Sequence, residues 1–251
     1  MSAHSNPYRS LDPAAMRAAE PGSVRRHFFS TAVGTKVLIA TTGLLLFLYL
    51  ILHLGGNVLL FFGPLEFNAW AHFLIRNPLI IPVEIGLTAV FIIHIYKTIV
   101  NYVVNKAARP VPYYQETKRL FGYGWGGKPS RKSISSVTML LSGLLTIFFV
   151  IIHIRHFKFG VEYLVPNTDV RDLYKLVYEL FSSGGIVAFY VFSMVVVGSH
   201  LWHGLSSALN SLGVDAPGLT PWILKVGRVV AVIISGGFMI LPVWVYVAGS
   251  R

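Results

Sequence analysis

The stretch "GTKVLIATTGLLLFLYLILHLGGN", residues 34 to 57, is apolar almost throughout and holds one histidine near its end. A helix needs about 20 apolar residues to cross a hydrocarbon core about 30 Å thick. Four more such stretches follow, and the predicted spans are residues 37–62, 79–104, 134–154, 186–209 and 229–248. Only helices satisfy the backbone polar groups of such runs in a bilayer, so the sequence predicts an all-α integral membrane bundle of five transmembrane helices, with a local kink near Pro242.

The composition agrees with a membrane protein and excludes several kinds of site. Hydrophobic residues make up 54% of the 251-residue chain, and charged residues only 12%. There is no cysteine, which excludes disulfides, thiolate metal sites, an iron–sulfur cluster held by this chain and a covalently attached c-type haem. The net charge of +11 comes from basic residues between the apolar runs, a pattern typical of membrane topology signals, and no nucleic-acid partner is expected.

Lysine and arginine counts predict the direction of the helices. Five basic residues precede the first span and seven lie in loop 105–133, whereas the loop between them holds only Arg76. The positive-inside rule therefore places the N-terminus and loop 105–133 in the cytoplasm and the C-terminus outside. Residues 1–33 are predicted as a cytoplasmic tail, 34–251 as the membrane domain and 169–181 as an amphipathic surface helix. No internal repeat stands out.

Each of the first four spans carries a histidine, namely His53, His94, His153 and His200, and the fourth also carries His203. Ionisable residues inside a membrane are rare and usually functional. Each of the four lies about two-thirds along its own predicted helix. Since consecutive helices run in opposite directions, we expect His53 and His153 toward the outer face and His94 and His200 toward the inner face, in two layers about 18 Å apart.

Two facing imidazoles on neighbouring helices, without cysteine, are what a six-coordinate b-type haem requires. Two pairs predict two haems stacked across the membrane. A proton-relay transporter is an alternative, but it predicts intramembrane acids, and Glu84 is the only acid in any span. An anchor whose histidines merely hydrogen-bond between helices is another alternative.

Small residues near the histidines offer room for a porphyrin or for helix packing: Gly55, Gly56, Gly86, Gly143, Gly198 and Gly204.

Several stretches, in order, resemble one family: the opening stretch, "EFNAWAHFL" (66–74), "VFIIHI" (90–95), "ARPVPYY" (108–114), "FFVIIHI" (148–154) and "HLWHGLSSALNSLG" (200–213). Together they resemble the cytochrome b membrane subunit of succinate dehydrogenase and fumarate reductase, in the version where one five-helix chain holds two haems b. The resemblance runs from about residue 34 to residue 213, which is most of the chain.

The resemblance implies a subunit of succinate:quinone oxidoreductase in the cell inner membrane. Its partners would be a flavoprotein with FAD and an iron–sulfur protein, both on the cytoplasmic side, and a membrane quinone, commonly menaquinone. This chain alone would carry no succinate chemistry. In the family's pairing, His53 and His153 would ligate the haem distal to the soluble subunits, and His94 and His200 the proximal one. A higher oligomer of the complex stays open, as does a cytochrome b of another respiratory complex, such as a hydrogenase or formate dehydrogenase.

Supporting residues are also candidates. Lys36, Arg131 and His27 can pair with haem propionates or the partner subunit, or serve as topology signals and lipid contacts. Asn57, one turn after His53, can hydrogen-bond in the distal pocket or between helices. Glu66, in the short outer loop, is the candidate proton donor or acceptor of a quinone site, or a plain solvated carboxylate.

His203 lies one turn nearer the cytoplasm than His200, and we expect His200 to be the iron ligand. His203 can instead bond a propionate or a quinone, or reach the interface. Loop 119–133 and the N-terminal tail are candidates for docking the iron–sulfur subunit or for contact with anionic lipid.

Overall fold

The computed structural model describes residues 28, 31–108, 139–214 and 218–249, and five of its helices are long and apolar enough to cross a membrane. These helices are α2 (Ala32–Val58), extended by the short 3-10 helix η2 (Leu59–Phe62), α4 (Ile80–Ala107), α7 (Met139–Phe157), α9 (Gly184–Ser211) and α10 (Thr220–Gly249). Two shorter helices, α3 (Pro64–Arg76) and α8 (Leu173–Phe181), join them at one end. In the described ranges there is no strand, only an isolated bridge between Leu164 and Arg171.

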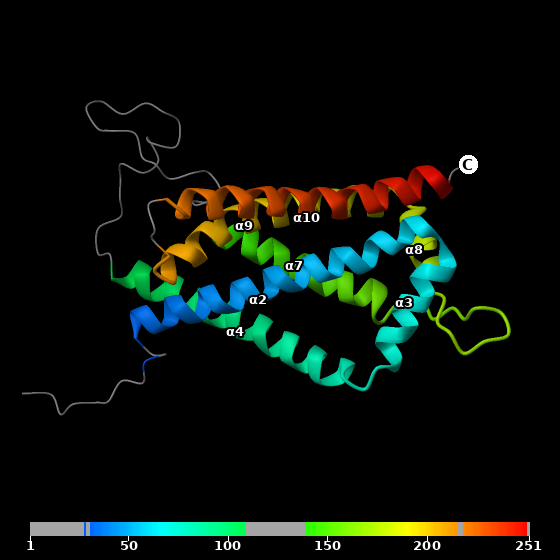
Figure 1. Cartoon of the computed structure of the whole chain (residues 1–251), viewed down its shortest axis with the longest axis horizontal. Helices are drawn as coiled ribbons and strands as arrows, with labels where there is room; N and C mark the ends of the chain where they lie inside the picture. Colours follow the sequence, from blue (N-terminus) through cyan, green and yellow to red (C-terminus); the bar gives the residue numbers. More distant parts are fainter. Residues whose placement is uncertain (1–27, 29–30, 109–138, 215–217, 250–251) are drawn as a thin grey trace, which may run out of the picture.

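The five long helices alternate in direction along the bundle (Figure 1). The end that carries α3 and α8, on the right in Figure 1, is called the α3/α8 end here. Helix α2 begins at the opposite end, where the hydroxyl of Thr31 accepts a hydrogen bond from the backbone N–H of Gly34. It reaches the α3/α8 end at Gly63, whose φ of 110° lies in the region that favours glycine. The chain therefore turns there directly into α3.

All five predicted spans are confirmed as helices, with shifted ends. The predicted start of the third span, residues 134–138, lies outside the described residues. Helix α10 begins nine residues earlier than predicted, at Thr220, with Pro221 at its first turn. The sequence did not indicate this start because Lys225 and Arg228 lower the local hydropathy. In the structure their cationic groups lie 5.3 Å and 5.5 Å from the rings of Trp222 and Trp202. Helix α10 runs through Pro242 without a break.

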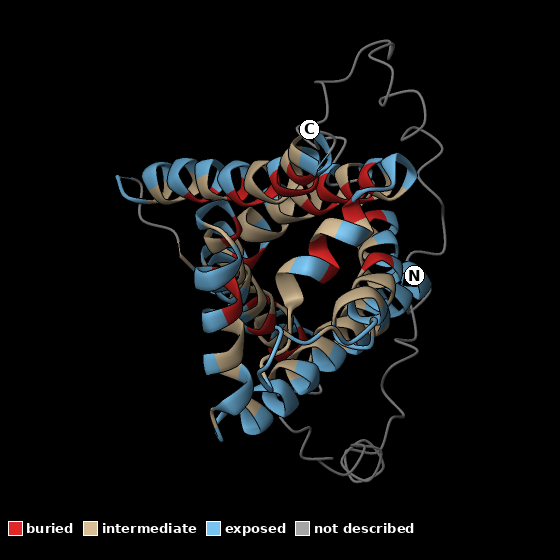
Figure 2. Cartoon of the chain, turned by 90° about the vertical axis from the view of Figure 1, so that its right-hand side faces the viewer, coloured by how far each residue is buried: buried red, intermediate tan, exposed pale blue. Residues whose placement is uncertain are grey.

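Helix α9 is the central element of the bundle, since it packs against α10, α2 and α7. A Cβ added at Gly198 would lie 2.8 Å from the Ser235 hydroxyl, so the contact between α9 and α10 depends on the missing side chain. Helix α4 packs along α2 and against α3, and none of its residues is buried. Figure 2, viewed from the α3/α8 end, shows that the buried residues face the inside of the bundle.

Helix α3 occupies the connection that was predicted as a short outer loop. The predicted amphipathic helix at 169–181 is present as α8 but starts at Leu173, because the Asp172 carboxylate caps it by accepting from the N–H of Lys175 at 3.0 Å. Its apolar face is buried rather than lying on a surface.

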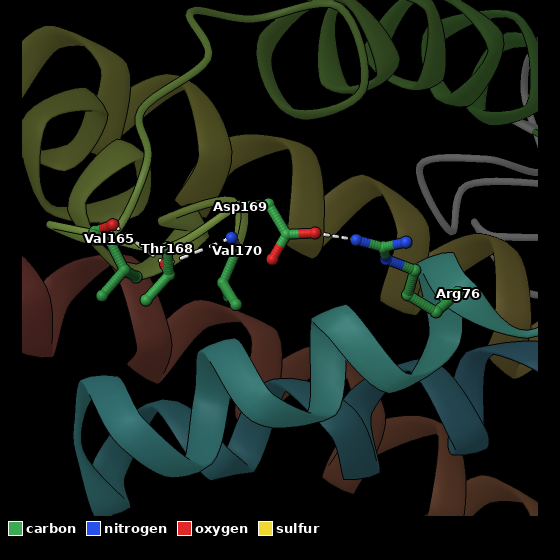
Figure 3. Close-up of polar contacts among 5 residues, drawn as sticks. All are labelled: Arg76, Val165, Thr168, Asp169 and Val170. Atoms are coloured by element: carbon green, nitrogen blue, oxygen red, sulfur yellow. Dashed lines mark hydrogen bonds and ion pairs between the residues drawn. The ribbon is translucent and has the colours of Figure 1, made fainter.

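Asn68 of α3 joins the two short helices. Its side chain is only 4% exposed, its amide donates to the Asp172 carboxylate at 2.9 Å, and its carbonyl accepts from the N–H of Tyr174 at 2.9 Å. An exposed ion pair between Arg76 and Asp169 ties the end of α3 to the turn before α8, as Figure 3 shows. Thr168 stiffens that turn by bonding to the backbone of Val165 and Val170.

Replacing Asn68 with alanine should destabilise the α3/α8 end. The change leaves the N–H of Tyr174 and the Asp172 carboxylate each without one partner, which costs about 1–3 kcal/mol. Thermal unfolding of the detergent-solubilised chain, followed by circular dichroism, should show a lower midpoint. Asn105→Ala, at an exposed position of α4, is the matched control and should leave the midpoint unchanged. Equal midpoints for the two variants would contradict the role given to Asn68.

Candidate functional site

The four predicted ligand histidines lie one on each of four helices. His53 is on α2, His94 on α4, His153 on α7 and His200 on α9, and each side chain is half-buried. Helix α10 carries none. Helices α2 and α7, which carry His53 and His153, run in one direction along the bundle. Helices α4 and α9, which carry His94 and His200, run in the other.

His53 and His153 face each other near the α3/α8 end. Their ring centroids are 5.9 Å apart and their planes are nearly perpendicular, at 87°. Aromatic rings surround the pair: Tyr49 stacks on His53 at 5.4 Å, Phe238 of α10 lies at 5.4 Å from His53, and Phe149 lies at 5.5 Å from His153. A bond from a metal to imidazole nitrogen is about 2 Å long, so two such bonds in line leave ring centroids about 6 Å apart. The observed spacing of this pair fits that arrangement.

His94 is held against α2 rather than against another histidine. Its Nδ1 lies 3.1 Å from the hydroxyl oxygen of Thr42 and 3.2 Å from the carbonyl oxygen of Ile39. A Cβ added at Gly43 would come within 3.1 Å of the His94 ring, so the imidazole occupies a notch in α2 that only glycine leaves open. The notch fixes the depth of His94 in the bundle.

His200 is held against α7 in the same manner. Its Nδ1 lies 3.1 Å from the hydroxyl oxygen of Ser142, and a Cβ added at Gly143 would lie 3.4 Å from its ring. His94 and His200 are close enough to interact electrostatically. These two histidines therefore form a second group, in which each ring rests on a hydroxyl and a glycine of a neighbouring helix.

The two groups lie in separate layers of the bundle. His53 follows Thr42 on α2 by 11 residues, and His153 follows Ser142 on α7 by the same number. At a rise of 1.5 Å per residue, each helix separates its histidine from its hydroxyl by about 17 Å. Since the hydroxyls mark the depth of His94 and His200, the spacing agrees with the two layers expected from the sequence.

Thr42 and Ser142 are site residues that the sequence analysis missed, although a signal for them exists. Residues 42–45 read "TGLL" and residues 142–145 read "SGLL", and in both helices a histidine follows the glycine by ten positions. An aromatic residue, Tyr49 or Phe149, stands four positions before each histidine. The two helices thus share a repeated unit. In leucine-rich segments such short matches arise by chance, and only the contacts reveal their meaning.

The supporting candidates fall in different places. The Asn57 amide donates to the His53 carbonyl oxygen at 2.8 Å and lies 3.5 Å from its Nδ1, so Asn57 belongs to the surroundings of His53. Lys36 is exposed in the second turn of α2. His203 is half-buried and close enough to His200 for an electrostatic interaction. Arg131, His27, loop 119–133 and tail residues 1–27 lie outside the described residues.

Glu66 lies in the first turn of α3 and is exposed to the outside of the bundle. An open groove of about 900 Å³ lies nearby, between α3 and residues 165–172, and includes His72 and Arg76 in its lining. Glu66 does not line this groove. The groove was not foreseen, because its two walls come from segments about 90 residues apart in the sequence.

Of the six glycines named from the sequence, four lie against another helix and two have open space where a side chain would be. Those that pack do so against another helix: Gly56 on Trp70, Gly143 on His200, Gly198 on Ser235 and Gly204 on Met139. A Cβ added at Gly55 or Gly86 would meet nothing within 4 Å. Helix packing is therefore confirmed for the first four positions, and room for a porphyrin stays a prediction at Gly55 and Gly86.

The donor set determines what the site can hold. Within the described part of the chain, Nε2 of none of the four histidines makes a hydrogen bond to the protein, and Nδ1 of His153 is buried without a partner. No cluster of three or more histidine, aspartate or glutamate residues forms among the residues described. Paired imidazoles with free Nε2 atoms suit a metal that takes its remaining ligands from a planar macrocycle.

Comparison of the chain with protein-family models, curated proteins and solved structures gives no match. The arrangement of the histidines and their neighbours is therefore what a functional assignment rests on.

Gly43→Ala should displace the His94 ring, because the new methyl group would approach it to 3.1 Å. Alanine also favours helix over glycine by up to about 1 kcal/mol, so the fair control is Gly55→Ala, which gains the same preference with nothing within 4 Å. We expect a lower thermal midpoint for Gly43→Ala than for Gly55→Ala in detergent. Equal midpoints would show that the notch does not hold His94.

Proposed function

We propose that the chain is a dihaem cytochrome b, the membrane anchor of a succinate:quinone oxidoreductase. The observation that supports this proposal is that four histidines, one on each of four helices, fall in two layers about 17 Å apart, with no hydrogen bond to Nε2 from the described residues and nearly perpendicular rings in the His53 and His153 pair. The motifs from residue 34 to residue 213 that resemble the family supply the link to succinate and fumarate chemistry.

In this proposal His53 and His153 hold one haem b through their Nε2 atoms, and His94 and His200 hold the other. Bound haem supplies one-electron redox chemistry. The protein's own part would be to bind and orient the haem and to keep water away from it. Tyr49, Phe149 and Phe238 surround the first pair with apolar rings, which exclude water from it.

The partners in this proposal are a flavoprotein and an iron–sulfur protein on the cytoplasmic side of the cell inner membrane, where the N-terminus of the chain would also lie. Electrons pass between the iron–sulfur protein and a quinone, for which menaquinone is the first choice. Glu66 remains a predicted proton donor or acceptor for the quinone, and its exposure at the α3/α8 end suits a site on the side away from the soluble partners.

The alternatives have less support. A proton relay needs acids inside the bundle, but Glu84, the one acid in the spans, pairs with Lys158 at 2.5 Å near the α3/α8 end. An anchor with structural histidines does not explain why, among the described residues, Nε2 has no protein partner on any of the four rings. A cytochrome b of a hydrogenase or formate dehydrogenase shares the haem sites and differs in its soluble partner.

The visible absorption spectrum of the purified chain tests the haem sites. We expect a strong Soret band and two haems per chain. His53→Ala should lose the haem of the α3/α8 layer and His200→Ala the other, each about half of the total. His203→Ala, one turn from His200, is the matched control and should keep both haems. Full haem content in both ligand variants would rule out the paired-ligand arrangement.

Purification of the intact complex tests the partner. The chain should co-purify with a flavin-bearing subunit and an iron–sulfur subunit, and the complex should oxidise succinate with a quinone acceptor in a malonate-sensitive reaction. Haem without a flavin partner, in a complex that is otherwise intact, would favour the hydrogenase or formate dehydrogenase alternative.

A further inference from the structure

We propose that Thr42 and Ser142 are positioning residues that fix the tautomer of His94 and His200, so that the proton sits on Nδ1 and Nε2 is left bare. The inference rests on the proposed function only for the identity of what Nε2 binds. The tautomers themselves are a property of the chain alone.

The bonds of the Thr42 hydroxyl determine the direction of the bond to His94. The hydroxyl carries one proton, which it directs within α2 at the Leu38 carbonyl oxygen at 2.7 Å, with the Ile39 carbonyl oxygen farther away at 3.1 Å. Its lone pairs are then available to accept from the His94 Nδ1–H at 3.1 Å. The Ile39 carbonyl oxygen, 3.2 Å from the same nitrogen, can only accept. Two acceptors therefore converge on Nδ1, and a proton there satisfies both.

Ser142 offers His200 a similar hydroxyl acceptor on α7, without the second, carbonyl acceptor that His94 has. Its hydroxyl donates to the Met139 carbonyl oxygen at 3.0 Å and lies 3.1 Å from Nδ1 of His200. A neutral imidazole carries a single ring proton, so placing it on Nδ1 leaves Nε2 with a lone pair that can bind a metal. The adjacent glycines, Gly43 and Gly143, let the rings approach closely enough for these bonds.

The other layer lacks this device and serves as an internal contrast. Nδ1 of His153 is buried without a hydrogen-bond partner, and Nδ1 of His53 faces the Asn57 amide nitrogen at 3.5 Å. No hydroxyl or carbonyl acceptor contacts Nδ1 of either ring in the described structure. The hydroxyl–glycine pairs thus link the two layers. Helix α2 carries His53 and contacts His94 through Thr42, and α7 carries His153 and contacts His200 through Ser142.

A bond from Nδ1–H to an acceptor also makes Nε2 a stronger electron donor to a metal. Stronger donation stabilises the ferric over the ferrous state of a ligated haem iron. Removing the hydroxyl of Thr42 or Ser142 should therefore raise the reduction potential of the haem held by His94 and His200, and leave the potential of the other haem unchanged.

The primary test uses the chain produced without haem, labelled with ¹⁵N-histidine and studied by solid-state NMR in lipid bilayers. We expect His94 and His200, assigned by their loss in His94→Gln and His200→Gln, to be Nδ1–H tautomers. Thr42→Val and Ser142→Ala should each raise the share of the Nε2–H form of the facing histidine about tenfold. Thr42→Ser, which keeps the hydroxyl, should behave as the wild type and excludes a general loss of folding as the cause.

Matched controls lie on the same helices. Thr41→Val and Thr146→Val remove hydroxyls that bond only to carbonyl oxygens of their own helix, and they should change no tautomer. An Nε2–H form of His94 and His200 in the wild type, or unchanged tautomers in both Thr42→Val and Ser142→Ala, would overturn the proposal.

A redox titration of the haem-loaded protein separates this proposal from the proposed function. One of two potentials should rise in Thr42→Val and stay the same in Thr41→Val. A wild-type chain that binds no haem would refute the cytochrome assignment, whereas the tautomers measured without haem would still decide this inference. Two haems with unchanged potentials and unchanged tautomers would refute only the positioning role.

Discussion

A neutral imidazole carries one donor nitrogen and one acceptor nitrogen, and burying either one in a helical bundle costs free energy unless a partner or a ligand replaces water. This constraint governs the arrangement of the four helices around the histidines. Nδ1 of His94 and Nδ1 of His200 each lie 3.1 Å from a hydroxyl oxygen of a neighbouring helix. His53 and His153 instead face each other within a shell of aromatic rings. Each solution requires particular neighbours at a particular depth, so the histidines specify how the helices are placed against one another.

Helix periodicity turns these local requirements into a layered structure. Because α2 and α7 run in the same direction and share the spacing from hydroxyl to histidine, they present the same two levels to the interior. Helices α4 and α9 run in the opposite direction. Their histidines, His94 and His200, lie at the level of the Thr42 and Ser142 hydroxyls. The result is a repeated spacing of hydroxyl, glycine and histidine on two of the five long helices. The fifth helix, α10, carries no histidine; it contributes Phe238 to the rings around His53 and supports α9 through a contact between Gly198 and Ser235.

The long helices and the depth of the histidines could be predicted from the sequence, because both follow from hydropathy and from a constant rise per residue. The start of α10 was misplaced because Lys225 and Arg228 look like loop residues, whereas their charges lie over tryptophan rings. Helix α3 was missed because its stability comes from Asn68 and its contact with α8, a partner more than 100 residues away. Thr42 and Ser142 were missed for a related reason: a hydroxyl in an apolar helix most often bonds to its own backbone, and only the position of the opposite imidazole distinguishes these two.

No residue of helix α4 is buried; the helix packs along α2 and against α3, and Glu84 near its start pairs with Lys158. The wall that carries His94 is therefore held with little buried side-chain surface. Any ligand that bridges His94 to His200 would tie this wall to α9. By mass action, occupancy of that layer and attachment of α4 are then linked, and each strengthens the other.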